Sequence, residues 1–321
     1  MGRLNVSLPE DLAPLVSKWR RKINLSEICA QALRSELAAV ESHRSAATLL
    51  AKIHRPASPL ERRLMQRYGL ADVRVSGDPV EHEAGLRESL GNVAAEYLSQ
   101  KLGAGAVLAI AGGRQSWCVV QHLGPRPLEI SLVALGYRHN DPHVLHAHAN
   151  TLTTLLWLLF SPRAVARLVG SDPEEILKPS LPVQPEPKYF VVASCAPFSA
   201  GGPLARLLGE ETTSTLLARG IACDFAYNFF DKHGRLVPVA IPGDQSVLSA
   251  GCLSMLSRRP DARVVLVAGG RQKVGAIRLA LEAKLCNTLV TDTATARDLI
   301  GKTARTARRT STRAALMRRT A

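Results

Sequence analysis

A stretch near the carboxyl end, residues 264–300, constrains the fold of this chain more than any other. It reads as a buried run of β-branched residues, a turn with two glycines, an amphipathic helix, a second buried run that ends in Thr291 and Asp292, and a further helix. Two buried strands joined by a helical crossover are typical of a parallel β-α-β unit. Ligands of open parallel sheets bind beyond the carboxyl ends of the strands, where the glycine turn and Asp292 fall.

The glycine turn, Gly269 and Gly270 with Lys273 three residues on, has two interpretations. Free backbone amides and a nearby ammonium would suit a small anionic ligand. The alternative is a tight turn with a solvated lysine, because two-glycine turns are far less specific than complete phosphate-binding loops.

Further buried runs upstream predict the rest of the sheet. The expected strands are residues 106–111, 130–135, 189–194, 264–268 and 287–291, separated by helical stretches such as 83–102, 144–160 and 203–219. This alternation predicts an α/β fold with a parallel sheet and helices on both faces. The first strand is followed by five residues that would suit a phosphate if both glycine turns meet at one sheet edge. These residues are Gly112, Gly113, Arg114, Gln115 and Ser116.

Length and composition narrow the class of protein. A chain of 321 residues suits one large domain and a small one. Its longest apolar run, residues 155–160, is too short to span a bilayer, and its amino end lacks the apolar stretch of a secretion signal, so we expect a cytoplasmic protein without membrane contact. The six cysteines have no CxxC spacing, which favours ordinary buried thiols over disulfides or a zinc site.

The net charge of +14 is concentrated at the two ends of the chain. Residues 1–64 hold 11 Lys and Arg against 6 Asp and Glu, and residues 302–321 hold 7 against none. The intervening residues hold 23 against 21. A neutral body with basic ends suggests contact with a polyanion through those ends. The alternative is that the basic ends only keep the protein soluble.

The amino-terminal segment alternates polar and apolar residues over residues 3–8, as a half-buried strand does. Pro9 ends that strand, a helix with Leu12, Leu15 and Trp19 on one face follows, and Ser26 is a good N-cap for a second helix. One strand and two helices in about 40 residues cannot bury a core alone, so we expect dimerisation.

These residues resemble the ribbon-helix-helix family of DNA-binding proteins (the CopG, Arc and MetJ type). The match is a polar and apolar strand, a "slP..L" entry and a second helix that begins at "nxSE" and contains "AL". The resemblance implies that Arg3, Asn5 and Ser7 reach base edges while amides near Ser26 hold a phosphate, with Lys22 close by. Arg and Asn suit guanine and adenine edges, and helix amino termini suit phosphate oxygens. A swapped oligomerisation hairpin without nucleic acid is the alternative.

The chain therefore divides into four predicted parts. Residues 1–44 form the ribbon-helix-helix segment, 45–65 a helical linker with a short helix after Pro59, 66–301 the α/β domain, and 302–321 a basic tail. The tail is rich in Thr, Ala and Arg, and we expect it to be disordered and to touch phosphates without sequence preference.

The α/β domain resembles the effector-binding domain of SorC-type transcriptional regulators. The matching segments are VLAIAGGRQS (107–116), GIACDFAYNFFDKHGR (220–235) and the run from 267 to 300. The last is similar to the family's "aGG..K..AI..AL.....n.LiTD..tA..Ll", and the middle one to its "GavgD..g.ffD..G". The resemblance implies a Rossmann-like parallel sheet shared with sugar-phosphate isomerases and deaminases.

The resemblance also implies a sugar-phosphate-like effector. Residues 112–116 would hold the phosphate and Lys273 would reach a ligand oxygen, with Asp231 and Asp292 near the pocket. The chain departs from the family in two ways. Arg114 and Gln115 stand where the family's first loop offers small hydroxyl residues, and the ribbon replaces the family's helix-turn-helix reader.

Two other groups of residues invite a chemical interpretation that the spacing does not favour. His139, His143, His146 and His148 do not place three imidazoles on one helical face, so a polar loop and helix start are expected rather than a metal. Asp224 and Asp231 have no nucleophile or base beside them, so turn and capping roles are expected. We expect no cofactor, no metal and no catalytic residue.

We therefore expect a homodimeric or tetrameric transcriptional regulator, with repression favoured, that binds double-stranded DNA and responds to a sugar phosphate or similar metabolite. One alternative is an isomerase-like or deaminase-like enzyme on the same fold, because a fold alone does not decide function. Another is a DNA-binding maintenance protein with a vestigial pocket.

Overall fold

The computed structural model describes residues 56–77, 82–137, 145–177, 188–239 and 245–301. All of these residues belong to one compact unit, His54–Ala321, and a second unit, Met1–Ile53, lies outside the described residues. The predicted ribbon-helix-helix segment and the basic tail from residue 302 also lie outside them, as does the DNA-contact set Arg3, Asn5, Ser7, Lys22 and Ser26.

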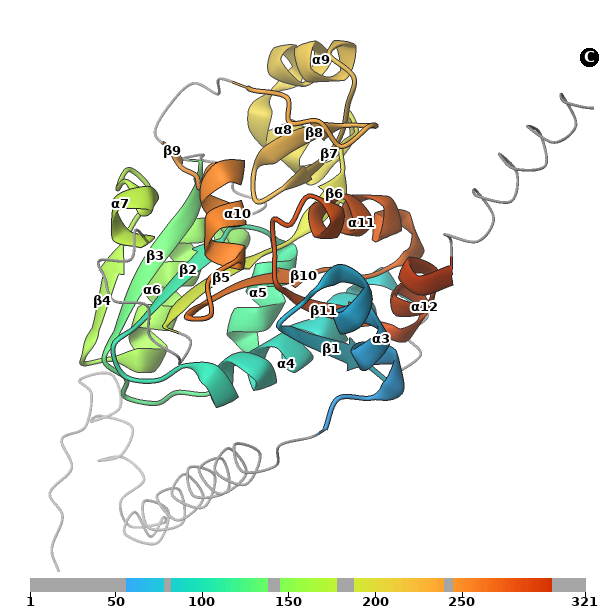
Figure 1. The fold of residues 1–321 in the computed structure, drawn as a ribbon. Coiled ribbons are helices and arrows are strands. Elements are labelled where there is room, and N and C mark those ends of the chain that lie inside the picture. The colour runs from blue at the N-terminus through green and yellow to red at the C-terminus, as the bar shows by residue number, and fades with distance from the viewer. Residues whose placement is uncertain (1–55, 78–81, 138–144, 178–187, 240–244, 302–321) are drawn as a thin grey trace, which may run out of the picture. The chain divides into compact units, whose positions relative to one another are not determined.

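The core of the described unit is a large sheet (Figure 1). Neighbouring strands along the main path are all parallel. A short strand, β9 (Gln245–Ser246), pairs antiparallel with the end of β3. In order across the sheet, the strands are β1 (Asp72–Ser76), β11 (Thr288–Asp292), β10 (Ala262–Val267), β5 (Tyr189–Ala193), β2 (Ala106–Ala111), β3 (Ile130–Tyr137) and β4 (Ala164–Arg167).

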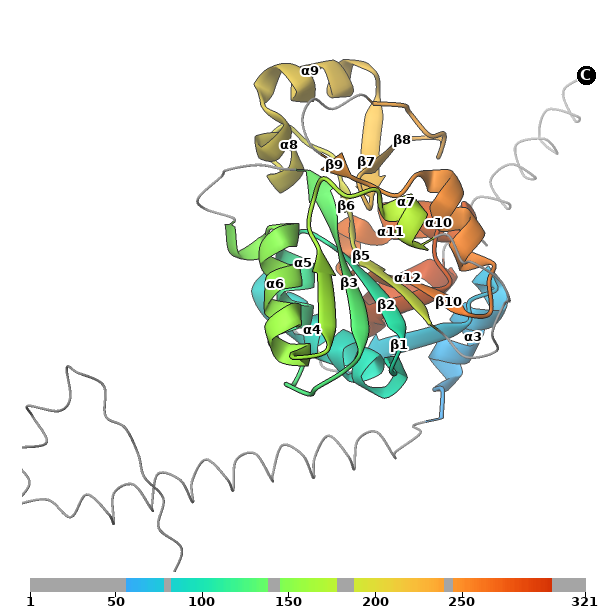
Figure 2. The ribbon, with the colours of Figure 1, turned by 90° about the vertical axis from the view of Figure 1, so that its left-hand side faces the viewer.

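Helices cover both faces of this sheet, as Figure 2 shows. One face carries α4 (Glu83–Lys101), α5 (Arg114–Gln121) and α6 (Ala149–Phe160) over one buried apolar cluster. The other face, over a second cluster, carries α3 (Pro59–Tyr68), α7 (Pro173–Leu177), α10 (Ala250–Ser257), α11 (Val274–Glu282) and α12 (Thr293–Gly301). The predicted α/β fold with a parallel sheet is confirmed. No helix within the described ranges combines the length and apolar character needed to cross a bilayer.

A smaller layer stands at the carboxyl end of the large sheet (Figure 1). It consists of an antiparallel sheet, β6 (Cys195–Pro197), β7 (Ile221–Phe225) and β8 (Asn228–Asp231), packed against α8 (Pro203–Leu208) and α9 (Glu210–Ala218). The single helix expected over residues 203–219 is wrong. Gly209 has φ +82°, which ends α8 and begins α9. Because β6 follows β5 after one residue, this layer lies directly beside the end of β5.

The predicted short helix after Pro59 is present as α3. Its amino end is a capping box in which the Ser58 hydroxyl accepts from the Glu61 amide at 3.2 Å and the Glu61 carboxylate accepts from the Ser58 amide at 2.6 Å. The same buried carboxylate accepts the Val75 amide at 2.8 Å, which joins α3 to β1. At the other end, the Tyr68 hydroxyl donates to the Leu299 carbonyl on α12 at 3.1 Å. Helix α3 is therefore part of the packed body.

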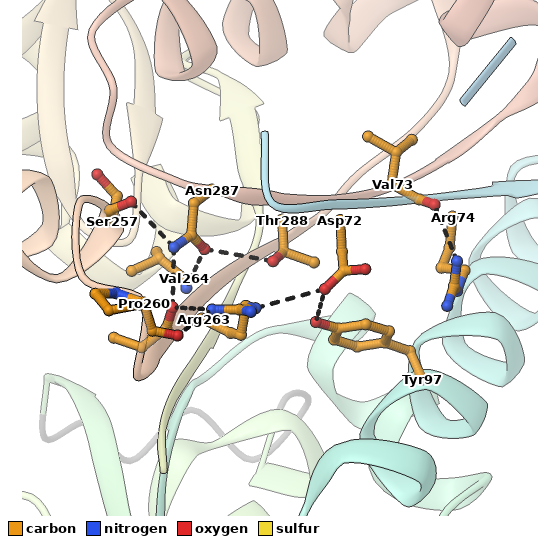
Figure 3. A network of polar contacts seen from close by, with 11 residues as sticks. Asp72, Val73, Arg74, Tyr97, Ser257, Pro260, Arg263, Val264, Asn287 and Thr288 are labelled. Carbon is orange, nitrogen blue, oxygen red and sulfur yellow. Dashed lines mark hydrogen bonds and ion pairs between the residues drawn. The ribbon is translucent and has the colours of Figure 1, made fainter. Parts of the chain in front are cut away.

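The amino edge of the large sheet is held by a polar network (Figure 3). The Asn287 amide group donates to the carbonyls of Ser257 at 3.0 Å and Ala262 at 2.9 Å, and its oxygen accepts the Val264 amide at 2.9 Å. The Thr288 hydroxyl donates to the same Asn287 side-chain oxygen at 3.3 Å. Asn287 thus satisfies several buried backbone groups at once where β10 and β11 begin.

The Asp72 carboxylate links β1 to helix α4 and to β10 at the same edge. The Asp72 side chain accepts the Tyr97 hydroxyl at 3.0 Å and lies 3.4 Å from the Arg263 guanidinium. Burial, with the charge of Asp72, raises the pKa of the Tyr97 phenol above its usual range. These groups lie at the end of the sheet opposite the candidate site, so their role is structural.

Candidate effector site

The two glycine turns do lie near one another at the carboxyl edge of the sheet. The chain passes from β2 to β3 on one side, and from β5 to β10 on the other, so the direction of winding reverses between β2 and β5. Such a switch point opens a crevice where ligands of parallel sheets bind. Gly112 follows β2 and Gly269 lies just beyond β10, with only β5 between these strands.

The first glycine turn is already largely occupied by bonds within the protein. The Gly112 amide donates to the Leu135 carbonyl at 3.0 Å, and the Gly113 amide donates to the Ala147 carbonyl at 2.8 Å. Gln115 is buried and donates to the Arg87 carbonyl at 3.0 Å, and Ser116 is buried as well. Of the five predicted residues, Gly113 and Arg114 are exposed.

Helix α5 begins at Arg114, and its first intrahelical bond is donated by Trp117 to the Gly113 carbonyl at 3.0 Å. The three preceding amides are the ones that a helix leaves without an intrahelical acceptor. Together with the Arg114 guanidinium, this first turn offers positive electrostatic potential at the mouth of the crevice.

The second glycine turn is packed against Asp292. The Gly270 amide donates to the Asp292 carboxylate at 2.8 Å, and a Cβ at position 269 would lie 2.4 Å from the same carboxylate oxygen. Asp292 also accepts the Thr295 amide at 2.9 Å and its hydroxyl at 2.6 Å, so it caps α12. The tight-turn interpretation accounts for Gly269, and the structure gives Asp292 a structural role.

Lys273 supplies the positive charge on the β10 side of the crevice. It ends a short 3₁₀ turn, η2 (Arg271–Lys273), and is half-buried. Its charge acts on Asp224 of β7 and on the buried Cys195 thiol of β6. Lys273 therefore faces the small antiparallel layer, and an anion in the crevice would share this ammonium with Asp224.

Asp224 is the titratable group in this crevice whose pKa is shifted toward neutrality. Burial raises the pKa of its carboxyl to about 7, although a hydrogen bond from the Tyr227 amide and the charge of Lys273 both lower it. The sequence alone suggested turn and capping roles for Asp224. The bond from the Tyr227 amide is a turn contact. Because Asp224 also lies beside Lys273, it is a further candidate site residue that sequence reasoning did not assign.

Tyr227 is a second residue that sequence reasoning missed. It lies in the two-residue turn between Phe225 and Asn228, and its ring packs edge-on against Tyr137 at 5.2 Å between centroids. The family pattern "GavgD..g.ffD..G" has a glycine where this chain has Tyr227. This difference was the signal in the sequence that could have identified the residue. The tyrosine pair lines one side of a groove of about 520 Å³ that also contacts Asp172, Leu236 and Val239.

Asp231 is not brought to the glycine turns. It pairs with Ile221 at the end of the β7–β8 hairpin away from Tyr227, roughly 10 Å along the strand from Asn228. Its carboxylate accepts the amides of His233 at 2.8 Å and Arg235 at 2.9 Å and pairs with the Arg235 side chain at 2.8 Å. These contacts form a turn, which is the role that its spacing suggested.

The other polar groups singled out in the sequence have ordinary roles where they are described. His148 caps α6 by accepting the Asn150 amide at 3.1 Å, and His146 packs edge-on against Trp117. Across the described ranges, no three His, Cys, Asp or Glu side chains gather into a metal site. The five described cysteines are buried free thiols, and burial raises the pKa of Cys223 and Cys286 to about 12.

Comparison with known proteins gives this architecture a family. A family model described as "Putative sugar-binding domain" matches residues 55–156 and 200–301, which is more than half of the chain. The chain belongs to this family. The match covers the α/β body, so the expected resemblance to a sugar-binding domain is confirmed at the level of this family.

Individual relatives agree with this assignment. The deoxyribonucleoside regulator of Bacillus subtilis is 26% identical over 253 residues, which cover 74% of this chain and 78% of the relative. The full-length sorbitol operon regulator SorC of Klebsiella pneumoniae superposes with a TM-score of 0.58 at 18% identity, covering 92% of this chain and 99% of that one. The probable sor operon regulator of Shigella flexneri gives 0.57 at 22% identity, covering 75% and 97%. The sugar-binding domain fold is therefore shared with transcriptional regulators.

The raised pKa of Asp224 predicts a pH dependence of stability. The folded protein keeps this proton up to a pH of about 7, whereas the unfolded chain releases it near its usual value of 3.8. The free energy of unfolding should therefore fall as pH rises from about 4 to 7, because over this range the folded state binds more protons. Asp224→Asn should flatten this part of the profile, measured by urea denaturation across that range.

Asp231→Asn is the matched control for this measurement. The backbone amide of Arg235 and the other donors of its turn lower the pKa of Asp231 to about 2, so this carboxyl contributes below about pH 5 and with the opposite sign, and leaves the slope between pH 5 and 7 unchanged. If the wild-type protein and Asp224→Asn had the same slope between pH 4 and 7, the assigned pKa of Asp224 would be wrong.

Proposed function

We propose that this protein is a DNA-binding transcriptional regulator, a repressor whose affinity for its operator changes when a sugar phosphate or related metabolite binds the α/β domain. The observation that carries the proposal is the sugar-binding family match over this domain. The relatives that it resembles are named as a deoxyribonucleoside regulator and a sorbitol operon regulator.

DNA recognition is assigned to the amino-terminal segment. Its ribbon-helix-helix pattern assigns base contacts to Arg3, Asn5 and Ser7, with phosphate contacts near Lys22 and Ser26. The excess of basic residues in this segment and in the tail supports contact with phosphates. A ribbon needs two chains, so the active form is a homodimer or tetramer.

Effector binding is assigned to the crevice at the switch point. Lys273 would hold the phosphate, the first turn of α5 with Arg114 would add positive potential at the mouth of the crevice, and the Asp224 carboxyl would form a hydrogen bond with a ligand hydroxyl. Gly112, Gly113, Gln115 and Ser116 would shape the turn between β2 and α5, because they bond within the protein or are buried.

The packing supports a route from this crevice to the DNA-binding end. Asp292 bonds the Gly270 amide and begins α12, and the last carbonyls of α12 accept bonds from Tyr68 and Arg67 of α3. Helix α3 follows the amino-terminal segment along the chain. An effector that binds more tightly to one position of the Gly270 turn would therefore favour one position of α3. A shift of α3 would in turn change the affinity of the amino-terminal segment for the operator.

Two experiments test the proposal. Footprinting of the full chain on fragments of its own genome would identify an operator, and fluorescence anisotropy would then compare the full chain with Arg3→Ala plus Asn5→Ala. Two lost base contacts should weaken specific binding by roughly 30-fold or more, at about 1–3 kcal/mol each. Specific binding that survived the double substitution, or that survived in a chain beginning at Ser58, would contradict the ribbon assignment.

The effector is tested by repeating the anisotropy with a panel of phosphorylated pentoses and hexoses and with triose phosphate. We expect at least one compound to shift the apparent affinity for DNA in the wild-type protein and not in Lys273→Ala. Lys232→Ala, a change of the same kind on the exposed turn after β8, should leave the shift intact. Silence of every compound would favour a vestigial pocket, and turnover of one abolished by Lys273→Ala would favour an enzyme.

A further inference from the structure

The turn between β7 and β8 has a backbone that its residues rarely adopt. Ala226 has φ +49° and Tyr227 has φ +66°, and the flanking residues Phe225 and Asn228 pair directly. Two-residue hairpin turns with both φ values positive ordinarily use Asn and Gly. A bulky residue in this conformation is a strained feature, and such features persist where the surrounding structure holds them and often serve a site.

Three sets of contacts hold Tyr227 in place. Its amide donates to the Asp224 carboxylate, and its ring packs against Tyr137. Its hydroxyl lies over two glycines on different strands: a Cβ at Gly112 would lie 2.9 Å from this oxygen, and a Cβ at Gly136 would lie 3.1 Å from it. The two glycines, at the ends of β2 and β3, therefore leave room for the phenol.

The phenol thus occupies the β2 side of the crevice. Lys273 lies on the β10 side, and β5 separates the two strands. A ligand that reached from the end of β10 to the end of β2 would cross two strand spacings, roughly 10 Å. The far part of that path is filled by Tyr227. The groove of about 520 Å³ that Tyr137 and Tyr227 line has neither Gly112 nor Lys273 among its lining residues.

We propose that Tyr227 limits the size of the effector, so that the crevice beside Lys273 accepts a short phosphorylated ligand, of the length of a triose phosphate, and excludes hexose phosphates. This inference rests on the effector site of the proposed function and specifies the ligand class of that site. Tyr227 is a specificity-determining residue because its phenol occupies the volume that a longer carbon chain would need.

Substitution with glycine gives a clean test, because Tyr227→Gly removes the phenol and also suits a backbone at φ +66°. The variant should therefore fold. Ala226→Gly is the matched control, since it relieves the neighbouring positive φ of +49° and leaves the phenol in place. Isothermal titration calorimetry of the full-length proteins would use glyceraldehyde 3-phosphate, ribose 5-phosphate and fructose 6-phosphate as probes.

We expect the wild-type protein and Ala226→Gly to bind glyceraldehyde 3-phosphate and to bind fructose 6-phosphate much more weakly. Tyr227→Gly should bind fructose 6-phosphate at least about tenfold more tightly than the wild type does, a difference that calorimetry resolves readily. Equal affinity of both proteins for fructose 6-phosphate would overturn the size limit, and so would weaker binding of all three probes by Tyr227→Gly. Silence of both proteins with all three probes would instead remove the effector site itself, and the size limit with it.

Discussion

Gly269→Ala is expected to destabilise the protein by about 3–5 kcal/mol. The new Cβ would lie 2.4 Å from the Asp292 carboxylate and 2.9 Å from a methyl carbon of Leu90, so one of these groups must move. Overpacking of this kind costs about 1–3 kcal/mol, and each hydrogen bond of Asp292 lost in the rearrangement adds roughly 1–3 kcal/mol. Urea denaturation followed by circular dichroism measures the change.

Gly275→Ala is the control for this substitution. Gly275 lies in the first turn of α11 with nothing within 4 Å of its missing Cβ, and it is exposed. Alanine there should stabilise the protein by up to about 0.5 kcal/mol, because glycine is the poorer helix former and the full difference applies in a helix interior. The same chemical change thus has opposite signs at two positions six residues apart. A Gly269→Ala protein as stable as the wild type would show that the turn is not packed on Asp292.

Asn287→Ala is expected to cost about 3 kcal/mol or more. The change leaves the Ser257 carbonyl and the Val264 amide without the side chain that now satisfies them at the start of β10 and β11, while the Ala262 carbonyl keeps its bond from the Arg263 guanidinium at 2.9 Å (Figure 3). Each buried group left without a partner costs roughly 1–3 kcal/mol. The same denaturation experiment measures the loss.

Thr288→Val is the comparison for Asn287→Ala, since it keeps the volume of the side chain and removes a hydroxyl that bonds Asn287 at 3.3 Å and also bonds the Tyr97 phenol. We expect a loss of about 1 kcal/mol. If Asn287→Ala cost no more than Thr288→Val, the amide of Asn287 would not be the main support of this edge.

The central strands were predictable because they are buried on both faces. The run at residues 106–111 matches β2 residue for residue, and the predicted strands that became β10 and β11 differ from the observed ones by one or two residues. A parallel strand covered by helices on both sides needs a continuous apolar run, which is visible in one dimension. The glycine turns were predictable for the same reason, since each follows such a run.

The edge strands were not predicted. β1, with the sequence DVRVS, and β4, with the sequence AVAR, are only partly buried and mix charged and apolar residues. An edge strand is stabilised by one neighbour and by what covers it, so its own residues carry little signal. The short strands of the small antiparallel layer were missed for the same reason, and with them the turn that carries Tyr227.

The sequence by itself determined the α/β class, the position of the glycine turns and the presence of Lys273 beside one of them, because each depends on residues close together in the chain. Only the tertiary structure decided that β5 lies between β2 and β10, that Asp292 supports a turn, and that Tyr227 fills the space over Gly112 and Gly136. Those facts depend on contacts between residues that are distant in the chain, and a local pattern does not encode such contacts.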